Sequence, residues 1–218
     1  MKKMYLLALI LVSVSSQAIY AQSASEKKAQ EILTRLEQKY KEAKTIRAYF
    51  AYEMTNTVNN VKEEVKGEFV MKDDMYRLKL LDQEIINNGK TMWTYLKETN
   101  EVNVTDYNPE ADDITPDKVF SLYKQDYRAN FIEEVVERGK VYQVVDLQPN
   151  DKSKKFYKIR LKINKNLNAI KSWEIFEKNQ NRFKYTISEI DYDVAVGDGY
   201  FSFDPDKYPD DIDIVDLR

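Results

Sequence analysis

The sequence predicts a mainly β protein with helices. Apolar residues recur every three or four positions up to residue 43, which is the period of an amphipathic helix. Beyond that point, apolar and polar residues alternate, which is the period of half-buried strands. Turn-forming clusters separate the alternating segments. We expect one long helix, one or more short central helices, and about ten or eleven strands in sequential hairpins. Such an antiparallel meander either covers one face with a helix or closes on itself.

The first predicted element is an amphipathic helix of about five turns. Ser25 is the expected N-cap, and Glu26 and Glu31 are acids close to the N-terminus, where they are favourable. Lys, Glu, Gln and Arg fill the positions between the apolar ones. The apolar stripe consists of Ala29, Ile32, Leu33, Leu36, Tyr40 and Ala43.

The first strand begins at Ile46, where the period changes to two. Its register predicts which side chains face the helix, because a slip of one residue would reverse every assignment. Arg47, Tyr49, Ala51, Glu53 and Thr55 fall on the outward side. The side chains expected on the concave side, against the helix, are Ile46, Ala48, Phe50, Tyr52 and Met54.

The remaining strands follow from the same alternation and from the turns between them. Asn87-Asn88-Gly89-Lys90 is a predicted tight turn, since Asn and Gly tolerate positive φ. Before the middle of the chain, strands are expected at 65–71, 76–80, 84–86, 91–96 and 101–107. After it, they are expected at Phe131–Glu137, Val141–Leu147, Phe156–Asn164, Ala169–Phe176, Phe183–Tyr192, Tyr200–Phe203 and Ile212–Val215.

A short central helix interrupts this pattern. Thr115-Pro116-Asp117 provides a cap, a first helical residue and a favourable acid. The helix is apolar on most of its faces, more than a connector between strands requires. We therefore predict a lid that packs into an apolar interior, formed by Val119, Phe120, Leu122, Tyr123 and Tyr127.

The N-terminus has the layout of a secretory signal. Lys2 and Lys3 precede an apolar run that continues to Val14, and small and polar residues follow up to Ala21. The run is shorter than the roughly 20 apolar residues that span a bilayer, which argues against a retained membrane anchor. Residues 1–21 are the expected signal peptide, and residues 22–218 a single exported, soluble domain. Because the chain has no Cys, neither disulfides nor a lipid anchor at the cut site are expected.

The composition argues against most catalytic and metal-binding sites. With no His and no Cys, the usual catalytic triads and nitrogen–sulfur zinc sites cannot form. The net charge of −3 becomes −5 without Lys2 and Lys3, and no basic stripe favours nucleic acid. The acidic segment at 204–216 lacks the EF-hand pattern of Gly and Glu. We therefore expect that the protein is not an enzyme and that it binds neither a metal nor a cofactor.

Four short motifs, in order along the chain, resemble one family. They are Lys44-Thr45-Ile46-Arg47-Ala48-Tyr49-Phe50, then Gly67-Glu68-Phe69-Val70-Met71-Lys72, then residues 84–95 around Asn88-Gly89-Lys90-Thr91, and finally Tyr200-Phe201-Ser202-Phe203-Asp204-Pro205. Together they resemble the periplasmic outer-membrane lipoprotein carrier family, LolA, with Asn88 in place of its usual Asp. The family fold is an incomplete antiparallel barrel of about eleven strands, with an N-terminal helix and a central helical lid.

The resemblance implies a chaperone. It would take acylated lipoproteins from an inner-membrane ABC transporter, shield their acyl chains and deliver them to the outer membrane, where a receptor is a further expected partner. We expect a periplasmic monomer whose cavity is formed by the helix stripe Ile32, Leu33, Leu36 and Tyr40 and the inward side of the first strand. Tyr76 matches the family's aromatic at the barrel mouth, which is used in loading. The family's best-known member has an Arg after the second strand, where this chain has Lys72-Asp73-Asp74.

Other classes stay open on the sequence alone. The outer-membrane receptor with this fold usually has a lipid-bearing Cys, which is absent here. A lipocalin would have an early G-x-W motif and a main helix after the barrel. This chain lacks that motif, and its long helix comes first. A membrane barrel would not need a long leading helix. A periplasmic sensor, or a carrier of other hydrophobic ligands with the same fold, is the main alternative function.

Overall fold

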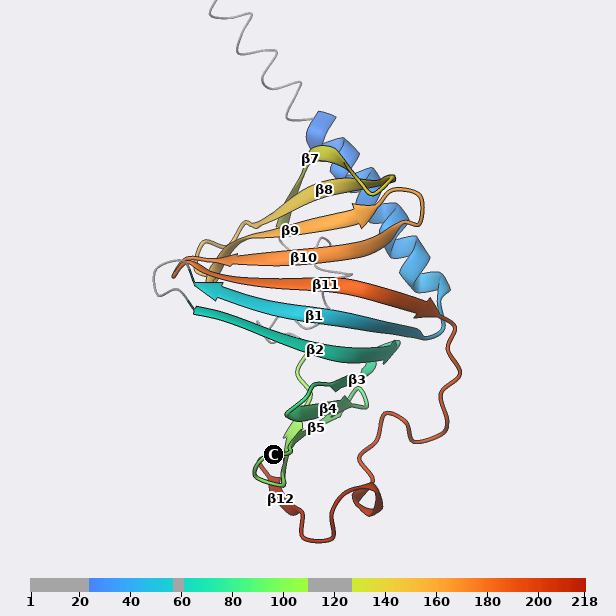
Figure 1. The fold of residues 1–218 in the computed structure, drawn as a ribbon, viewed down its shortest axis with the longest axis vertical. Helices are drawn as coiled ribbons and strands as arrows, with labels where there is room; N and C mark the ends of the chain where they lie inside the picture. The colour runs from blue at the N-terminus through green and yellow to red at the C-terminus, as the bar shows by residue number, and fades with distance from the viewer. Residues whose placement is uncertain (1–23, 57–60, 110–126) are drawn as a thin grey trace, which may run out of the picture.

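A curved twelve-stranded sheet and one long helix make up most of the structure (Figure 1). The computed structural model describes residues 24–56, 61–109 and 127–218. The long helix covers residues 24–42 of this part. A 3₁₀ turn, Pro205–Lys207, lies near the C-terminus. The sequence therefore predicted the fold class correctly as mainly β with an N-terminal helix.

The strands follow one another almost entirely as antiparallel neighbours. Their order across the sheet is β12-β6-β5-β4-β3-β2-β1-β11-β10-β9-β8-β7. The first six are β1 (Ile46–Asn56), β2 (Val61–Lys72), β3 (Met75–Lys79), β4 (Gln83–Asn87), β5 (Thr91–Leu96) and β6 (Glu101–Asp106). The others are β7 (Tyr127–Glu137), β8 (Lys140–Pro149), β9 (Phe156–Asn164), β10 (Ala169–Glu177), β11 (Asn181–Tyr192) and β12 (Asp213–Asp216).

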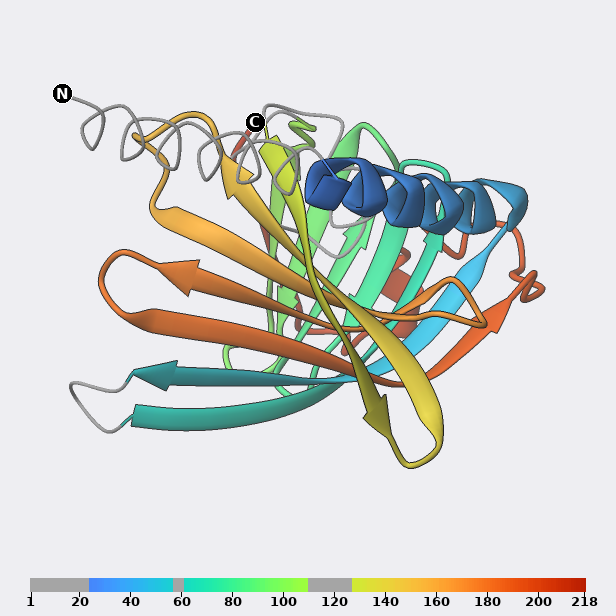
Figure 2. The same cartoon turned by 90° about the horizontal axis from the view of Figure 1, so that it is seen from above.

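The sheet bends around its concave side but stays open. β7 and β12 end the strand order on opposite sides and do not pair with each other. Figure 2 shows the strands curving around an interior, with the helix along one side of it. The expected incomplete barrel is thus an open sheet of twelve strands, one more than the family pattern implied. β1 joins the two halves, because it pairs with β2 on one side and with β11 on the other.

The helix lies against the half of the sheet formed by β1 and β7–β11. Its apolar stripe is almost completely buried with inward side chains of these strands. Near its start, the Ser25 hydroxyl donates to the Phe131 carbonyl at 2.8 Å. Near its end, the Tyr40 hydroxyl accepts from the Ile170 backbone N–H at 3.2 Å. Ser25 is therefore inside the helix and bound to β7, and its predicted role as N-cap is wrong.

Bulges shift the inward side of several strands. In β11 a register shift opposite Tyr49 and Phe50 changes the parity. Inward residues are Phe183, Tyr185 and Ile187 before the bulge, and Ile190 and Tyr192 after it. β7 and β10 have comparable shifts. Such bulges bend the strand and increase its twist, which helps this sheet to curve.

The tight turn at residues 87–90 forms as predicted between β4 and β5. Gly89 has a φ of 85°, in the region that glycine adopts without strain. The Asn87 side chain accepts from the Gly89 N–H at 2.8 Å. The Asn88 side chain accepts from the N–H groups of Lys90 and Thr91 at 3.0 and 2.8 Å. Asn88 thus replaces the family's Asp as an acceptor without adding a charge.

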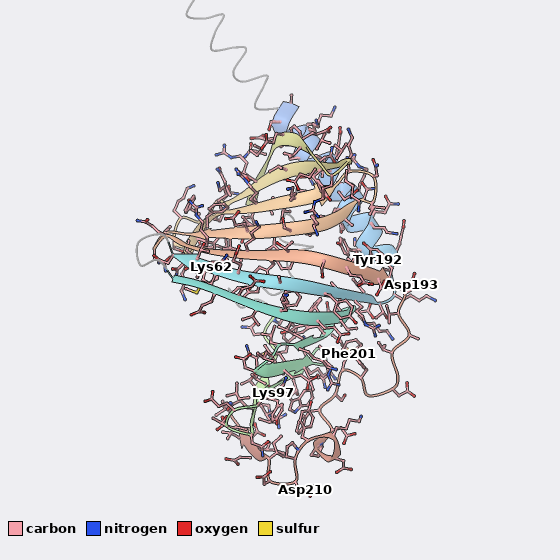
Figure 3. All side chains as sticks on the ribbon, in the orientation of Figure 1. Lys62, Lys97, Tyr192, Asp193, Phe201 and Asp210 are labelled. Carbon is pink, nitrogen blue, oxygen red and sulfur yellow. The ribbon has the colours of Figure 1, made fainter. Side chains whose placement is uncertain are left out.

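The C-terminal segment departs from the predicted meander. Residues 200–203 form a turn and a bend rather than a strand, so the predicted strand Tyr200–Phe203 is wrong. Phe201 is instead buried, and its segment passes beside the short strands β3–β5 (Figure 3). The chain then enters β12, which lies one residue from the predicted strand and pairs with β6 in parallel. A long connection over the outward face makes this parallel pairing possible.

Two predictions fall on residues that the structure does not describe. The signal peptide, residues 1–21, is one. The other is most of the central lid, since Val119, Phe120, Leu122 and Tyr123 also lie outside the described residues. Tyr127, which was assigned to the same helix, begins β7, so that part of the prediction is wrong.

Candidate functional site: an apolar concave face

The larger apolar cluster lies between the helix and the sheet. It includes all four helix residues expected in the cavity, together with Ile46 and Ala48 of β1. The structure thus places the start of the inward side of β1, Ile46 and Ala48, against the helix, as the predicted register requires. The sheet contributes further buried residues from β8–β11, which are Val145, Leu147, Phe156, Ile159, Leu161, Ile163, Ile170, Trp173, Ile175 and Ile187.

A second cluster continues the concave face across β1–β4. Its buried members are Phe50, Phe69 and Tyr76. Partly buried side chains pack around them, namely Tyr52, Met71, Leu78, Leu80, Ile85, Tyr107 and Tyr185. Tyr185 lies where the two clusters meet, since it packs against both. The apolar surface therefore extends over both halves of the sheet.

Five rings form an aromatic cluster in the centre of this face: Phe50, Tyr52, Trp173, Phe183 and Tyr185. Trp173 stacks on Tyr185 with ring centres 4.6 Å apart and planes at 7°. Tyr52 contacts Tyr185 at 4.9 Å and Phe183 at 6.2 Å. Phe50 and Tyr185 are 6.1 Å apart. These ring contacts join side chains of three strands, β1, β10 and β11, into one aromatic surface.

Tyr52 and Tyr185 are the titratable groups of the aromatic cluster. Burial raises the pKa of Tyr185, and so does the neighbouring Tyr52. Burial also raises the pKa of Tyr52, with smaller contributions from Glu63 and Glu177. Both phenols are therefore neutral at physiological pH. Across residues 24–56, 61–109 and 127–218, no group of three or more acidic side chains could hold a metal ion.

A buried hydrogen-bond donor on this face lacks an acceptor. The indole N–H of Trp173 makes no hydrogen bond, although the residue is only 2 % exposed. Leaving a buried donor unpaired costs free energy, roughly 1–3 kcal/mol. This part of the face is thus apolar and buried.

The predicted cavity residues are found on this face, at different depths. Ile32, Leu33, Leu36, Tyr40, Ile46, Ala48 and Phe50 are buried, whereas Tyr52 and Met54 are partly buried. Tyr76 is 2 % exposed, and its hydroxyl donates to Met92 Sδ at 3.6 Å. The residue expected at the barrel mouth is therefore buried in the second cluster. Prediction missed the contribution of β10 and β11. Period-two alternation around Phe183 and Tyr185 was the available signal, but it does not reveal that β11 pairs with β1.

Gly67 allows a close approach between β2 and the concave face. A Cβ at this position would lie 2.7 Å from Leu80 Cδ2, 2.7 Å from the Lys79 carbonyl oxygen and 2.8 Å from Phe50 Cζ. Real side chains do not tolerate such distances, and the carbonyl belongs to a neighbouring strand. Leu80 can therefore lie over Gly67 beside the Phe50 ring.

We expect Gly67→Ala to destabilise the protein by about 1–3 kcal/mol, because the sheet must shift to admit the methyl group. Urea unfolding measures the change. Gly197→Ala is the matched control, since nothing lies within 4 Å of its Cβ position and its φ is not positive. A loss of stability equal in the two variants would show that the close approach at Gly67 has no energetic importance.

Comparison with known proteins places this surface in context. The family model "Outer membrane lipoprotein carrier protein LolA" matches residues 41–204. No curated protein is significantly similar in sequence. An uncharacterized conserved protein from Thermus thermophilus has a TM-score of 0.58 and 15 % identity, over 87 % of this chain and 99 % of that one. A LolA superfamily protein from Nitrosomonas europaea has a TM-score of 0.44 and 12 % identity, over 80 % and 97 %.

The Thermus protein shares the fold, and the family model extends from the end of the helix across β1–β11. Within the described residues, no helix is long and apolar enough to cross a membrane. The matched region holds β1–β11, including the aromatic cluster. On this match, the chain belongs to the outer membrane lipoprotein carrier protein LolA family.

Proposed function

We propose that this protein is a periplasmic carrier that binds the acyl chains of lipoproteins and takes them from the inner to the outer membrane. The observation that supports it most is the continuous apolar concave face within a chain of the LolA family. An inner-membrane ABC transporter would supply the lipoprotein. An outer-membrane receptor is a further proposed partner, and the protein acts as a monomer without a cofactor.

The proposed cargo explains why such a surface is useful. Each acyl methylene exposed to water costs about 0.8 kcal/mol, so two or three chains make unaided transit prohibitively slow. A carrier must cover these chains and must also release them. Aromatic and aliphatic walls with few hydrogen-bond partners cover them without holding them more tightly than a bilayer does. The open edges of the sheet suit a cargo whose protein part stays outside.

The proposed acyl site can be tested with a tryptophan reporter. Trp173 lies on the concave face, whereas the register of β5 places Trp93 on the outward face. In a Trp93→Phe variant, we expect brominated stearate to quench the Trp173 fluorescence in a saturable manner. Absence of quenching, with circular dichroism showing a folded protein, would argue against an acyl site on this face.

Native mass spectrometry of the protein from periplasmic extract then identifies the cargo. Recovery of acylated proteins supports lipoprotein carriage. Recovery of free lipids alone would instead favour the alternative, a carrier or sensor of other hydrophobic ligands with the same fold.

A further inference from the structure

One end of the sheet is basic, although the chain as a whole is acidic. Residues 151–184 contain eleven Lys and Arg against three Asp and Glu, whereas the whole chain has 34 against 37. The β8–β9 connection and the β10–β11 turn lie side by side at this end (Figure 1). The Lys178 N–H donates to the Lys155 carbonyl at 3.0 Å, and the Lys178 ammonium donates to the Lys152 carbonyl. Two segments that are distant in the sequence therefore bring their lysines together.

Several cations at this end are not neutralised by an acid. Farther along β9, Arg160 binds Asp146, with Nε and Oδ1 2.7 Å apart. By contrast, among the residues that the structure describes, Lys155, Lys178 and Arg182 form no ion pair, and all three are exposed. Exposed cations without a counter-charge attract anions and lose little hydration when they bind one.

A small pocket of about 210 Å³ opens beside these charges. Its lining includes Tyr157, Phe176, Glu177, Gln180 and Arg182. The pairing between β9 and β10 shifts here, so that Tyr157 has no partner in the register, and it is 50 % exposed. Such a bulge directs a side chain away from the face that alternation would give it. The pocket therefore has an exposed aromatic ring in its wall.

The ring of Phe176 supports Arg182 at the pocket. The guanidinium carbon of Arg182 lies 5.3 Å from the ring centre, and the Lys158 ammonium lies 4.1 Å from it. A guanidinium that lies on a ring keeps its N–H groups available for hydrogen bonds. Among the described residues, neither the Arg182 guanidinium nor the Gln180 side-chain amide has a hydrogen-bond partner. The planar N–H fork of an arginine matches the two oxygens of a carboxylate.

The acids at this end favour a polypeptide over a uniform polyanion. Glu177 lines the pocket, and its carboxylate accepts from the Asn181 side chain at 3.3 Å. Asp151 directly precedes Lys152 in the β8–β9 connection. A nucleic acid has a charge at every position, so some of its phosphates would face these carboxylates at a cost. A polypeptide can place its carboxylates beside the cations and its neutral residues beside the acids.

We propose that this end of the sheet docks an acidic segment of a partner protein. One carboxylate of the segment enters the pocket and binds the Arg182 guanidinium, while neighbouring carboxylates meet Lys155 and Lys178. The site is on the outward side of the sheet, because Arg182 directly precedes the inward Phe183 in β11. The inference goes beyond the proposed acyl site, and its test uses cargo-free protein.

Fluorescence anisotropy measures the interaction with a capped decapeptide of alternating Glu and Gly that carries an uncharged dye. We expect a dissociation constant of roughly 10–100 μM in low salt. Arg182→Gln should weaken binding about ten-fold, and Lys178→Gln about three-fold. The same peptide with Gln in place of every Glu should not bind. Lys90→Gln removes an exposed charge from the β4–β5 turn and should leave the affinity within about two-fold of the parent.

Crosslinking locates the site independently of affinity. A carbodiimide joins a carboxylate of the bound peptide to a nearby lysine as an amide, and mass spectrometry identifies that lysine. We expect crosslinks at Lys155 and Lys178 and none at Lys90.

Several results would overturn the proposal. They are absence of binding, crosslinks spread evenly over the chain, equal losses of affinity in Arg182→Gln and Lys90→Gln, or tighter binding of an oligothymidylate than of the acidic peptide. The quenching of Trp173 by brominated stearate should stay unchanged in Arg182→Gln, so failure here leaves the acyl site standing.

Discussion

Replacing Glu84 by Ala is expected to destabilise the protein by about 3–5 kcal/mol, the usual effect of breaking a buried ion pair. Glu84 Oε1 lies 2.6 Å from Arg77 Nε, and the side chains are only 10 % and 12 % exposed. The Tyr208 hydroxyl donates to Glu84 Oε2 at 2.8 Å. Arg77 also donates to the Tyr200 carbonyl at 3.0 Å and to the Tyr208 hydroxyl at 3.2 Å.

The large effect follows from what this network connects. Arg77 and Glu84 lie on the outward face of β3 and β4, and their partners belong to the C-terminal segment. Removing Glu84 leaves a guanidinium buried without its counter-charge and frees that segment. Arg77→Met with Glu84→Leu removes both charges, so this double variant should be more stable than Glu84→Ala. Lys62→Ala, which breaks an exposed pair with Glu53 at 3.1 Å, should cost less than about 1 kcal/mol.

The same network predicts a dependence on pH. Burial alone would raise the pKa of Glu84, but hydrogen bonds from Arg77 and Tyr208 and the charges of Arg77 and Lys79 together lower it. A carboxylate with a lowered folded-state pKa contributes stability above its unfolded pKa and loses it as the pH falls through the folded value. The stability difference between the parent and Glu84→Ala should therefore be constant near neutral pH and shrink below about pH 4.3. Urea unfolding over a pH series measures it, and a difference independent of pH would contradict this role of Glu84.

Elements with an uninterrupted period were predictable from the sequence. The helix stripe from Ala29 to Tyr40 keeps its spacing throughout, and all its members are buried. β1 alternates without a break, so its inward side was assigned correctly. The turn at Asn88-Gly89 formed as expected because local side-chain hydrogen bonds determine it.

Elements that depend on distant partners were not predictable. The bulge in β11 reverses the inward parity between Ile187 and Ile190, and nothing in the local pattern marks it. The aromatic residues at 200–203 alternate as a strand would, yet Phe201 is buried in a turn beside β3–β5. Ser25 has the sequence of a cap but donates to Phe131, about a hundred residues away along the chain. In each case a tertiary contact replaces the local preference.

The aromatic cluster gives the sharpest test of the proposed acyl site. We expect Phe183→Glu to weaken binding of a fluorescent fatty acid about 100-fold, because the acyl chain would have to displace water from a carboxylate. Phe183 is only partly buried, near the start of β11, and its ring centre lies 6.2 Å from that of Tyr52. A charge there can stay hydrated in the empty protein, so the fold should survive. Circular dichroism and urea unfolding check that it does.

The control for Phe183→Glu lies three residues further along the same strand. Thr186 pairs with Ala51 of β1 and Ser172 of β10, on the outward side of the sheet. Thr186→Glu therefore adds the same charge to β11 without changing the concave face, and fatty-acid affinity should stay within about two-fold of the parent. If both variants fold and lose affinity equally, acyl chains are not bound on the concave face. If only Phe183→Glu loses affinity, the binding surface includes the aromatic cluster, where β11 brings Phe183 and Tyr185 beside residues of β1 more than a hundred positions earlier in the chain.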